Sequence, residues 1–374
     1  MSLIRDIKDI DAPYGLRPRA CERCQRRDGF LLRCSCCKTV YYCGRGCQVA
    51  DRPRHKKPCK AISAALRHFD LEYTLLRDKP SQLFLPERVL ETCVGRFWGI
   101  FETRSYMRAR FGVVDTLLRN YGGVGGSADV VQTALGHLLE MMRLCRSDNM
   151  GLRHHIAPLL IRLDRDQESY DFIKWYINVE KDDTYDWGDM DLPFLDVKNA
   201  DMLEAPPKRW FAVDPWLQLS HVVPLLLIKV RIWLDLRAIR NLSWAVGVLL
   251  PQDLMDRIGV DIAGRIVLHR SDLRLTDSEQ MASLAKTLKS DIWDLYRAVD
   301  NYSEYFWDIL LDDPDEAIEA QPGCYSPRSE QEALLMGSFN VASWYETPGA
   351  VEVLRRMREA DVEGSCRAKS ILTI

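Results

Sequence analysis

The sequence lacks an uninterrupted apolar run long enough to cross a bilayer. A membrane-spanning helix needs about 20 consecutive, predominantly apolar residues. The stretch 216–250 is long enough, but titratable side chains interrupt it at His221, Lys229, Arg231, Asp235, Arg237 and Arg240. We therefore expect a long buried helix there and no membrane association. The N-terminal residues contain early acids and no apolar core of signal-peptide length, so no secretory leader is expected.

Motifs that carry catalysis are also missing. The sequence contains no G-x-S-x-G nucleophile elbow and no Gly-rich phosphate loop, and no Cys/His nucleophile pair lies outside one N-terminal cluster. Adjacent His154 and His155 would face different directions on a helix, which disfavours chelation of one ion. The acids of residues 185–196 do not follow the spacing of an EF-hand loop. We expect no enzymatic activity.

Cysteine, by contrast, is abundant and clustered near the N-terminus. Seven cysteines and one histidine follow the pattern C-x2-C-x9-C-x2-C-x5-C-x3-C-x7-H-x3-C. They are Cys21, Cys24, Cys34, Cys37, Cys43, Cys47, His55 and Cys59. Eight soft ligands complete two tetrahedral zinc sites with none left over. A segment this short buries little core, so two structural zinc ions are expected to supply its folding energy.

The remaining cysteines do not suggest a disulfide framework. Cys36 lies between two ligands but breaks the C-x2-C spacing, so it is not expected to bind metal. The other four are scattered: Cys93, Cys145, Cys324 and Cys366. Metal-type clustering with isolated thiols is typical of a reducing compartment. We expect an intracellular protein of the cytoplasm or nucleus.

The spacing groups the eight ligands into four pairs but leaves their partition open. Each C-x2-C pair forms a tight knuckle on one ion, and the two x3 pairs can each lie one helical turn apart on a helix face. Sequential partition would join the first pair with the second. Interleaved partition, in which the chain crosses between the metals, would join the first pair with the third. Both arrangements fit the spacing.

The segment from Cys21 to Cys59 resembles a MYND-type zinc finger. The resemblance covers all eight ligand positions, the aromatic residue of Tyr42-Cys43, Gln48 and Asp51. It implies the interleaved partition. Cys21, Cys24, Cys43 and Cys47 would share one zinc, and Cys34, Cys37, His55 and Cys59 the other.

The resemblance also implies a groove that binds proline-rich peptides. In MYND fingers a tryptophan and a glutamine help form this groove. Gln48 is present, but Arg52 stands where the tryptophan is usual. The substitution removes an apolar wall and adds a positive charge. We therefore predict a partner site at Gln48 and Arg52 that favours a peptide with an acidic residue beside its proline.

Charge is distributed unevenly along the chain. Residues 17–60 carry thirteen Lys or Arg against three acids, a formal charge of +10, although the whole chain carries −3. The rest of the chain therefore carries −13. A basic surface favours acidic partners, either protein or nucleic acid. Because the segment offers no recognition helix like that of a C2H2 finger, a nucleic acid is the less favoured partner.

Helical periodicity dominates the rest of the sequence. The expected helices span residues 86–103, 105–120, 128–146, 149–163, 166–179, 216–249 and 277–311, the last with a break near Asp300. Residues 147–175 read as a helical hairpin that is similar to tetratricopeptide-type repeats. The run YGGVGGS before Ala128 is expected to be a flexible loop. The chain as a whole resembles fungal MYND-finger proteins with an α-helical, tetratricopeptide-like region.

These observations predict a small two-zinc, cross-braced MYND finger followed by a mostly α-helical domain with degenerate helical-repeat architecture. The predicted divisions are an N-terminal tail (1–16), the finger (17–60), the helical domain (61–312), and a linker with a C-terminal helical tail (313–374). The expected function is protein–protein interaction as a scaffold, with a role in transcriptional regulation among the expectations.

Two alternatives stay open. One is an enzyme whose site lies in the helical domain and which the finger targets. The other is a non-specific nucleic-acid binder that uses the basic finger. A lysine methyltransferase with a split SET domain is not expected, because only 20 residues precede Cys21 and no N-H-S-C-like cofactor motif follows.

Overall fold

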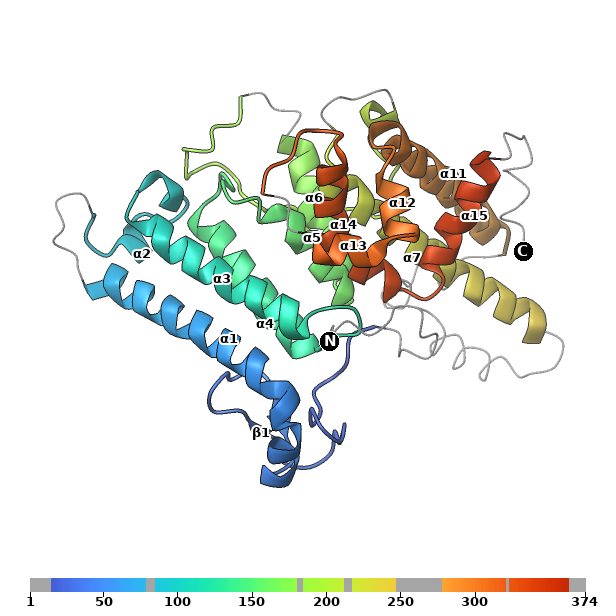
Figure 1. Ribbon diagram of the computed structural model, residues 1–374. Helices are drawn as coiled ribbons and strands as arrows, with labels where there is room; N and C mark the ends of the chain where they lie inside the picture. The colour runs from blue at the N-terminus through green and yellow to red at the C-terminus, as the bar shows by residue number, and fades with distance from the viewer. Residues whose placement is uncertain are drawn as a thin grey trace. The chain divides into compact units, whose positions relative to one another are not determined.

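The structure is a computed structural model that describes residues 15–78, 85–179, 184–211, 217–246, 278–320 and 323–362. These residues form a small finger and a mostly helical region with twelve α-helices (Figure 1). They divide into two compact units, one of residues 1–159 and 179–196, the other of residues 160–178 and 197–374. Within the described residues, no helix combines the length and the apolarity that crossing a membrane requires.

The first unit begins with an antiparallel hairpin of β1 (Leu32–Arg33) and β2 (Tyr41–Tyr42), in which Leu32 pairs with Tyr42. The helices that follow are α1 (Arg45–Asp78), α2 (Val89–Thr92), the 3-10 helix η1 (Phe97–Gly99), α3 (Thr103–Tyr121), α4 (Ala128–Leu144) and α5 (Arg153–Arg162). The boundary between the units falls inside α5.

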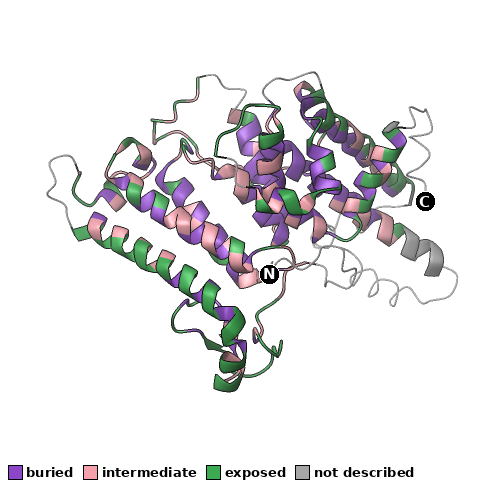
Figure 2. Ribbon diagram, viewed as in Figure 1, coloured by how far each residue is buried: buried purple, intermediate pink, exposed green. Residues whose placement is uncertain are grey.

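Helix α1 joins the finger to the helices without interruption. It is 34 residues long, and the predicted boundary between residues 60 and 61 lies inside it. The continuity follows from the sequence, because no glycine or proline separates Cys59 from the apolar-periodic residues 61–76. Much of the surface of α1 is exposed (Figure 2), and its buried positions fall on one side.

Helix α3 packs antiparallel to α1 around one tyrosine. The Tyr106 ring lies 5.5 Å from that of Phe69 and 6.3 Å from that of Tyr73 on α1, and 6.2 Å from that of Phe97 in η1. The Arg110 side chain donates to the Tyr106 hydroxyl at 2.7 Å. Aromatic pairs at such separations stabilise packing beyond the area they bury. They fix the outer half of α1 against the start of α3.

The core of the finger continues into these helices. Ile62 of α1, Val113 and Leu117 of α3, and Val130 of α4 belong to the same buried cluster as ligands of the finger. The finger therefore packs on α3 and α4 as part of one core. Burial of this apolar surface adds to the stability that metal binding supplies.

The glycine-rich turn between α3 and α4 is held by the residues before the finger. The Arg17 N–H donates to Gly126 O at 2.7 Å, and the Ala128 N–H donates to Arg17 O at 2.9 Å. The Arg17 side chain also donates to Gly125 O at 2.9 Å. The sequence predicts a flexible loop here. The structure shows a turn with hydrogen bonds to a second segment.

Gly126→Ala is expected to destabilise the first unit. A Cβ at this position would lie 2.6 Å from the carbonyl oxygens of Gly123 and Tyr121, so the turn must shift. Overpacking of this kind costs about 1–3 kcal/mol of unfolding free energy, which urea denaturation followed by circular dichroism would measure. Gly123→Ala is the matched control, because its Cβ would meet nothing within 4 Å. Equal stability of the two variants would contradict this account of the turn.

The helix expected over residues 86–103 does not form as one element. Only α2 and η1 lie there, because Arg88 (φ 53°) and Gly95 (φ 89°) adopt left-handed conformations that a helix excludes. A Cβ on Gly95 would lie 2.1 Å from the Met190 sulfur. The absence of a side chain there therefore lets the loop around Met190 approach closely.

The second unit is built from helices. They are α6 (Asp166–Val179), the 3-10 helix η2 (Lys208–Phe211), α7 (Leu219–Val246), α11 (Ser278–Tyr302), α12 (Phe306–Leu311), α13 (Pro314–Glu319), α14 (Glu330–Tyr345) and α15 (Ala350–Val362). In its core the Trp307 ring stacks on Tyr296 at 5.0 Å and meets the edge of Trp344 at 6.3 Å. Arg162 and Glu346 form a buried two-bond ion pair, both at 2.8 Å.

The residues expected to form a linker and tail contribute to this unit. Pro314 opens the short helix α13, as proline favours a first helical position, and Ala317 packs with 0% exposure. Trp344 of α14 and Leu354 of α15 are also fully buried. The predicted domain boundaries and the predicted repeat character stay predictions. Residues 1–14 of the predicted N-terminal tail and residues 363–374 of the C-terminal tail lie outside the described residues.

Candidate metal centre

The first two cysteine pairs lie in two turns of the same construction. In the Cys21–Cys24 turn, the Gln25 N–H donates to the first cysteine's carbonyl at 2.8 Å, with a Gln25 φ of 60°. In the Cys34–Cys37 turn, the Lys38 N–H donates to the first cysteine's carbonyl at 2.9 Å, with a Lys38 φ of 50°. Each chain reversal directs both thiols of its pair toward one point, as a zinc knuckle requires.

The other four ligands come from β2 and α1. Cys43 follows the end of β2 directly, and Cys47 lies in the first turn of α1. His55 and Cys59 lie four residues apart on the same face of α1, and each is 2% exposed. One helix therefore contributes ligands to both metal sites, which fixes the distance between them.

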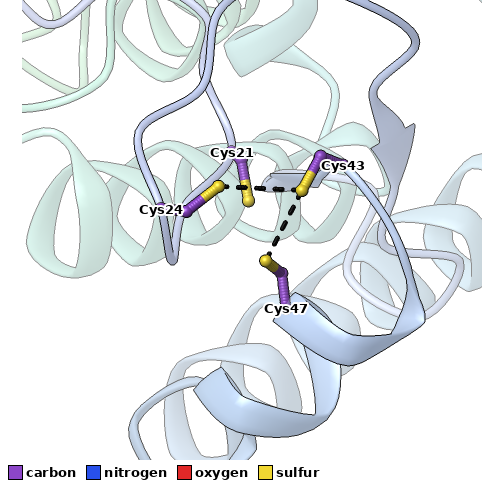
Figure 3. Close-up of side chains that lie close together, drawn as sticks. All are labelled: Cys21, Cys24, Cys43 and Cys47. Carbon is purple, nitrogen blue, oxygen red and sulfur yellow. Dashed lines mark hydrogen bonds between the residues drawn. The ribbon is translucent and has the colours of Figure 1, made fainter.

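The structure gathers the eight residues into two groups. Cys21, Cys24, Cys43 and Cys47 form site 1, and Cys34, Cys37, His55 and Cys59 form site 2. Within each group, all ligand atoms lie within 4.8 Å of one another. Figure 3 shows the four thiols of site 1 turned toward a common centre. The partition is interleaved, so the chain crosses between the metals three times, and the cross-braced arrangement is confirmed.

The distances between ligand atoms fit tetrahedral zinc. Zinc–sulfur and zinc–nitrogen bonds of ordinary length give sulfur–sulfur edges of about 3.8 Å and sulfur–nitrogen edges of about 3.6 Å. In site 1 the Cys43 sulfur lies 3.6 Å from that of Cys24 and 3.5 Å from that of Cys47. In site 2 the His55 Nε2 lies 3.4 Å from the Cys34 sulfur and 3.8 Å from that of Cys37.

The protonation chemistry of the ligands also fits a metal. Proton sharing with Cys43, together with burial and nearby thiols, raises the pKa of Cys47 to about 12. A cation at the centre of site 1 would hold this sulfur as a thiolate at neutral pH. Burial lowers the pKa of His55 and favours the neutral imidazole that binds zinc. Four protein ligands close each site, as in structural zinc centres.

Site 2 is held by a tyrosine distant in sequence. Because the His55 Nε2 faces the thiols, its Nδ1 carries the proton and donates to the Tyr121 hydroxyl at 2.8 Å. Tyr121 is the last residue of α3. Burial raises the pKa of this tyrosine, so its hydroxyl stays neutral. Sequence reasoning missed Tyr121, since it lies 66 residues from the histidine and outside the cysteine pattern.

A buried aspartate fixes the start of α1 to the finger. Asp51, 3% exposed, accepts from the Tyr42 hydroxyl at 2.7 Å and from the Arg54 Nε at 3.1 Å. Arg54 also donates to the backbone oxygen of Glu22 at 3.1 Å, beside the first knuckle. Tyr42 packs edge-on against the His55 ring at 5.9 Å. Asp51 is one of the positions that carry the resemblance to MYND fingers. In the structure it connects α1 to β2 through its hydrogen bond from Tyr42.

Comparison with known proteins agrees with this geometry. The family model of the MYND finger matches residues 21–59. Residues 21–59 are a MYND-type zinc finger. Its two sites, with the eight ligands predicted from the sequence, bind zinc.

The curated relatives share the MYND finger and little more. The SET domain and MYND-type zinc finger protein 6 of Schizosaccharomyces pombe is 45% identical over 60 residues, which are 16% of this chain and 12% of that protein. The N-lysine methyltransferase SMYD2-B of Danio rerio is 40% identical over 50 residues, 13% of this chain and 12% of that protein. The zinc finger MYND domain-containing protein 10 homolog of Drosophila melanogaster is 46% identical over 39 residues, 10% of this chain and 8% of that protein. No solved structure matches the chain significantly.

The predicted partner residues lie one turn apart on the first part of α1. Gln48 is half-buried, and Arg52 is exposed. Between them, Val49 leaves 63% of its surface exposed. The structure therefore places an amide, an apolar side chain and a cation on one accessible stretch of the MYND finger.

Cys43→Ala is expected to lose zinc and unfold the finger, because one missing thiolate opens a shell that supplies folding energy. Elemental analysis of the purified variant would measure zinc per chain. Cys36→Ala is the matched control, since this exposed thiol belongs to neither group. Two zinc ions retained by Cys43→Ala, or one lost by Cys36→Ala, would refute the ligand assignment.

Tyr121→Phe is expected to weaken zinc binding at site 2 while leaving two zinc ions bound at saturation. Removal of a hydrogen-bond partner behind a ligating histidine typically costs about 10–100-fold in metal affinity. Competition with a chromophoric chelator would measure the loss. Tyr73→Phe is the control, because Tyr73 packs in the same unit and no hydrogen bond of its hydroxyl is found among the described residues. An unchanged affinity in Tyr121→Phe would contradict the role of the hydroxyl.

Proposed function

We propose that this protein is a non-catalytic interaction scaffold whose MYND finger binds an acidic protein or peptide partner. The observation that carries the proposal is the charge of the finger surface. Two of its three acids, Glu22 and Asp51, pair with Arg54 at 3.3 and 3.1 Å, and their side chains are only 13% and 3% exposed. The exposed charge is therefore dominated by arginine and lysine, which favours an acidic partner.

Gln48, Val49 and Arg52 are the proposed contact residues. Within the described part of the chain, Arg52 forms no ion pair and its side chain forms no hydrogen bond, so its charge is available to a ligand. A carboxylate beside a proline would pair with the guanidinium, while the proline ring would cover Val49. MYND fingers are zinc-binding protein-interaction modules, which supports this use of the surface.

Three further observations support the proposal. Both zinc sites are closed by protein ligands, which argues against metal catalysis in the finger. Seven of the eleven cysteines in the described part of the chain are zinc ligands and none of the eleven forms a disulfide, which supports a reducing compartment, cytoplasm or nucleus. Similarity to the curated relatives is confined to the finger and brings no activity to the helices. A role in transcriptional regulation rests on the likeness to other MYND fingers.

Arg52→Glu is expected to reverse the charge preference of the finger. Fluorescence anisotropy would compare two proline-containing peptides that differ only in an aspartate or a lysine beside the proline. The natural protein should prefer the aspartate peptide by about tenfold, and the variant should prefer the lysine peptide, because a charge-assisted hydrogen bond contributes about 1.5–3 kcal/mol.

Arg27→Glu makes the same charge change at another exposed position of the finger and is the control. It should keep the preference for the aspartate peptide. Equal effects of the two substitutions would mean that overall charge, and not a site at Arg52, selects the peptide. A salt dependence of binding as steep as that of nucleic-acid binders, together with tighter binding of a single-stranded oligonucleotide, would favour the nucleic-acid alternative.

A further inference from the structure

The opposite end of α3 from the zinc site carries a cluster of aromatic and basic side chains, two of them exposed and two half-buried. We call Trp98, Phe101, Arg104 and Arg108 the Trp98 cluster. The guanidinium carbons of Arg104 and Arg108 lie 5.3 and 5.4 Å from the centre of the Trp98 ring. Arg104 also lies 5.6 Å from the Phe101 ring. Both cations are therefore stacked on one indole.

The cluster is built on a fixed backbone. The Arg104 Nε donates to the Trp98 carbonyl at 2.9 Å, which ties the first turn of α3 back to η1. The Thr103 hydroxyl donates to the carbonyls of Phe97 and Ile100. Phe97 is 0% exposed and packs on Tyr106, so the core fixes the position of η1, which carries Trp98. A preorganised platform lowers the entropic cost of binding.

No carboxylate among the described residues neutralises the two arginines of the cluster, and much of its apolar surface is exposed. Among the described residues, Arg104 and Arg108 form no ion pair. Arg119 on the same helix, by contrast, pairs with Asp115 at 2.6 Å. Phe101 leaves 74% of its surface exposed, which is costly for a phenyl ring. Two guanidiniums without an ion pair among the described residues and an exposed phenyl ring form a surface suited to a ligand that is both anionic and apolar.

We propose that the Trp98 cluster is a docking site for a peptide segment that combines carboxylates with an aromatic or branched apolar side chain. The carboxylates would pair with Arg104 and Arg108, and the apolar side chain would cover Phe101 and the edge of Trp98. Charge complementarity selects a peptide over a nucleic acid. The cluster offers two guanidiniums, which match a short segment with two carboxylates, whereas a nucleic acid is held by a longer row of phosphate contacts.

This surface is separate from the Gln48–Arg52 stretch. Tyr121, which binds the zinc-site histidine, lies 17 residues after Arg104 on α3, about 25 Å along the helix. A partner with two suitable segments could occupy both surfaces and gain affinity from their fixed spacing. The inference does not depend on peptide binding by the finger.

The test uses a short fluorescent peptide with several aspartates around a central leucine and phenylalanine, titrated with the zinc-loaded full chain. Arg108→Ala is expected to weaken binding about tenfold, because it removes a charge-assisted contact. Phe101→Ala should weaken binding several-fold by removing apolar contact. Arg119→Ala is the matched control, since it removes the same residue type from the same face of α3 three turns away, and it should change binding little.

Several outcomes would overturn the inference. They are no binding of the peptide by the natural chain, equal effects of Arg108→Ala and Arg119→Ala, or full affinity for a peptide in which asparagine replaces every aspartate. Tighter binding of a single-stranded oligonucleotide would assign the cluster to nucleic acid. Loss of peptide binding in Arg52→Glu but not in Arg108→Ala would place the peptide on the finger, and that outcome refutes this inference while it supports the proposed function. Unchanged circular dichroism would show that each variant is folded.

Discussion

The rest of the first unit depends on the two-sided bonding of His55. One ring nitrogen faces the thiols of site 2, and the other donates to the last residue of α3. The histidine therefore couples the metal shell to the helical packing. Because α1 also carries Cys59 and Ile62, the ligand set and the start of the apolar core lie on one rigid element. Metal binding and helix packing stabilise the same structure, and loss of either weakens the other.

The position of each arginine on helix α1 decides whether its charge is neutralised within the finger. Arg54 is occupied by Glu22 and Asp51, so it contributes to the integrity of the finger and little to its outer charge. Arg52, two residues earlier, points to a different side of α1 and forms no ion pair among the described residues. Helical geometry thus separates a structural arginine from one available to a partner. The same contrast recurs on α3, where Arg119 pairs with a carboxylate and Arg108 forms no ion pair within the described part of the chain.

The ligands of the two zinc sites could be predicted from the sequence. The contacts that hold these ligands in place could not. Regular spacing identified all eight ligands, because zinc requires soft ligands at short, fixed separations. Their partition came from the resemblance, since four pairs of similar spacing permit two arrangements. Tyr121 could not be predicted, because contacts between distant segments leave no periodic signal. The helix expected over residues 86–103 was wrong for a local reason, as Arg88 and Gly95 adopt backbone conformations that apolar periodicity does not report.

The continuity of α1 has a consequence for genetics. The curated relatives align over the finger alone, which suggests a unit that can be deleted without harm to its neighbours. In this chain such a deletion would remove the first part of α1 and expose the apolar faces of α3 and α4 that it covers. A null phenotype from that allele would report general misfolding and degradation. Only alleles that alter surface side chains can separate recognition by the finger from the stability of the chain.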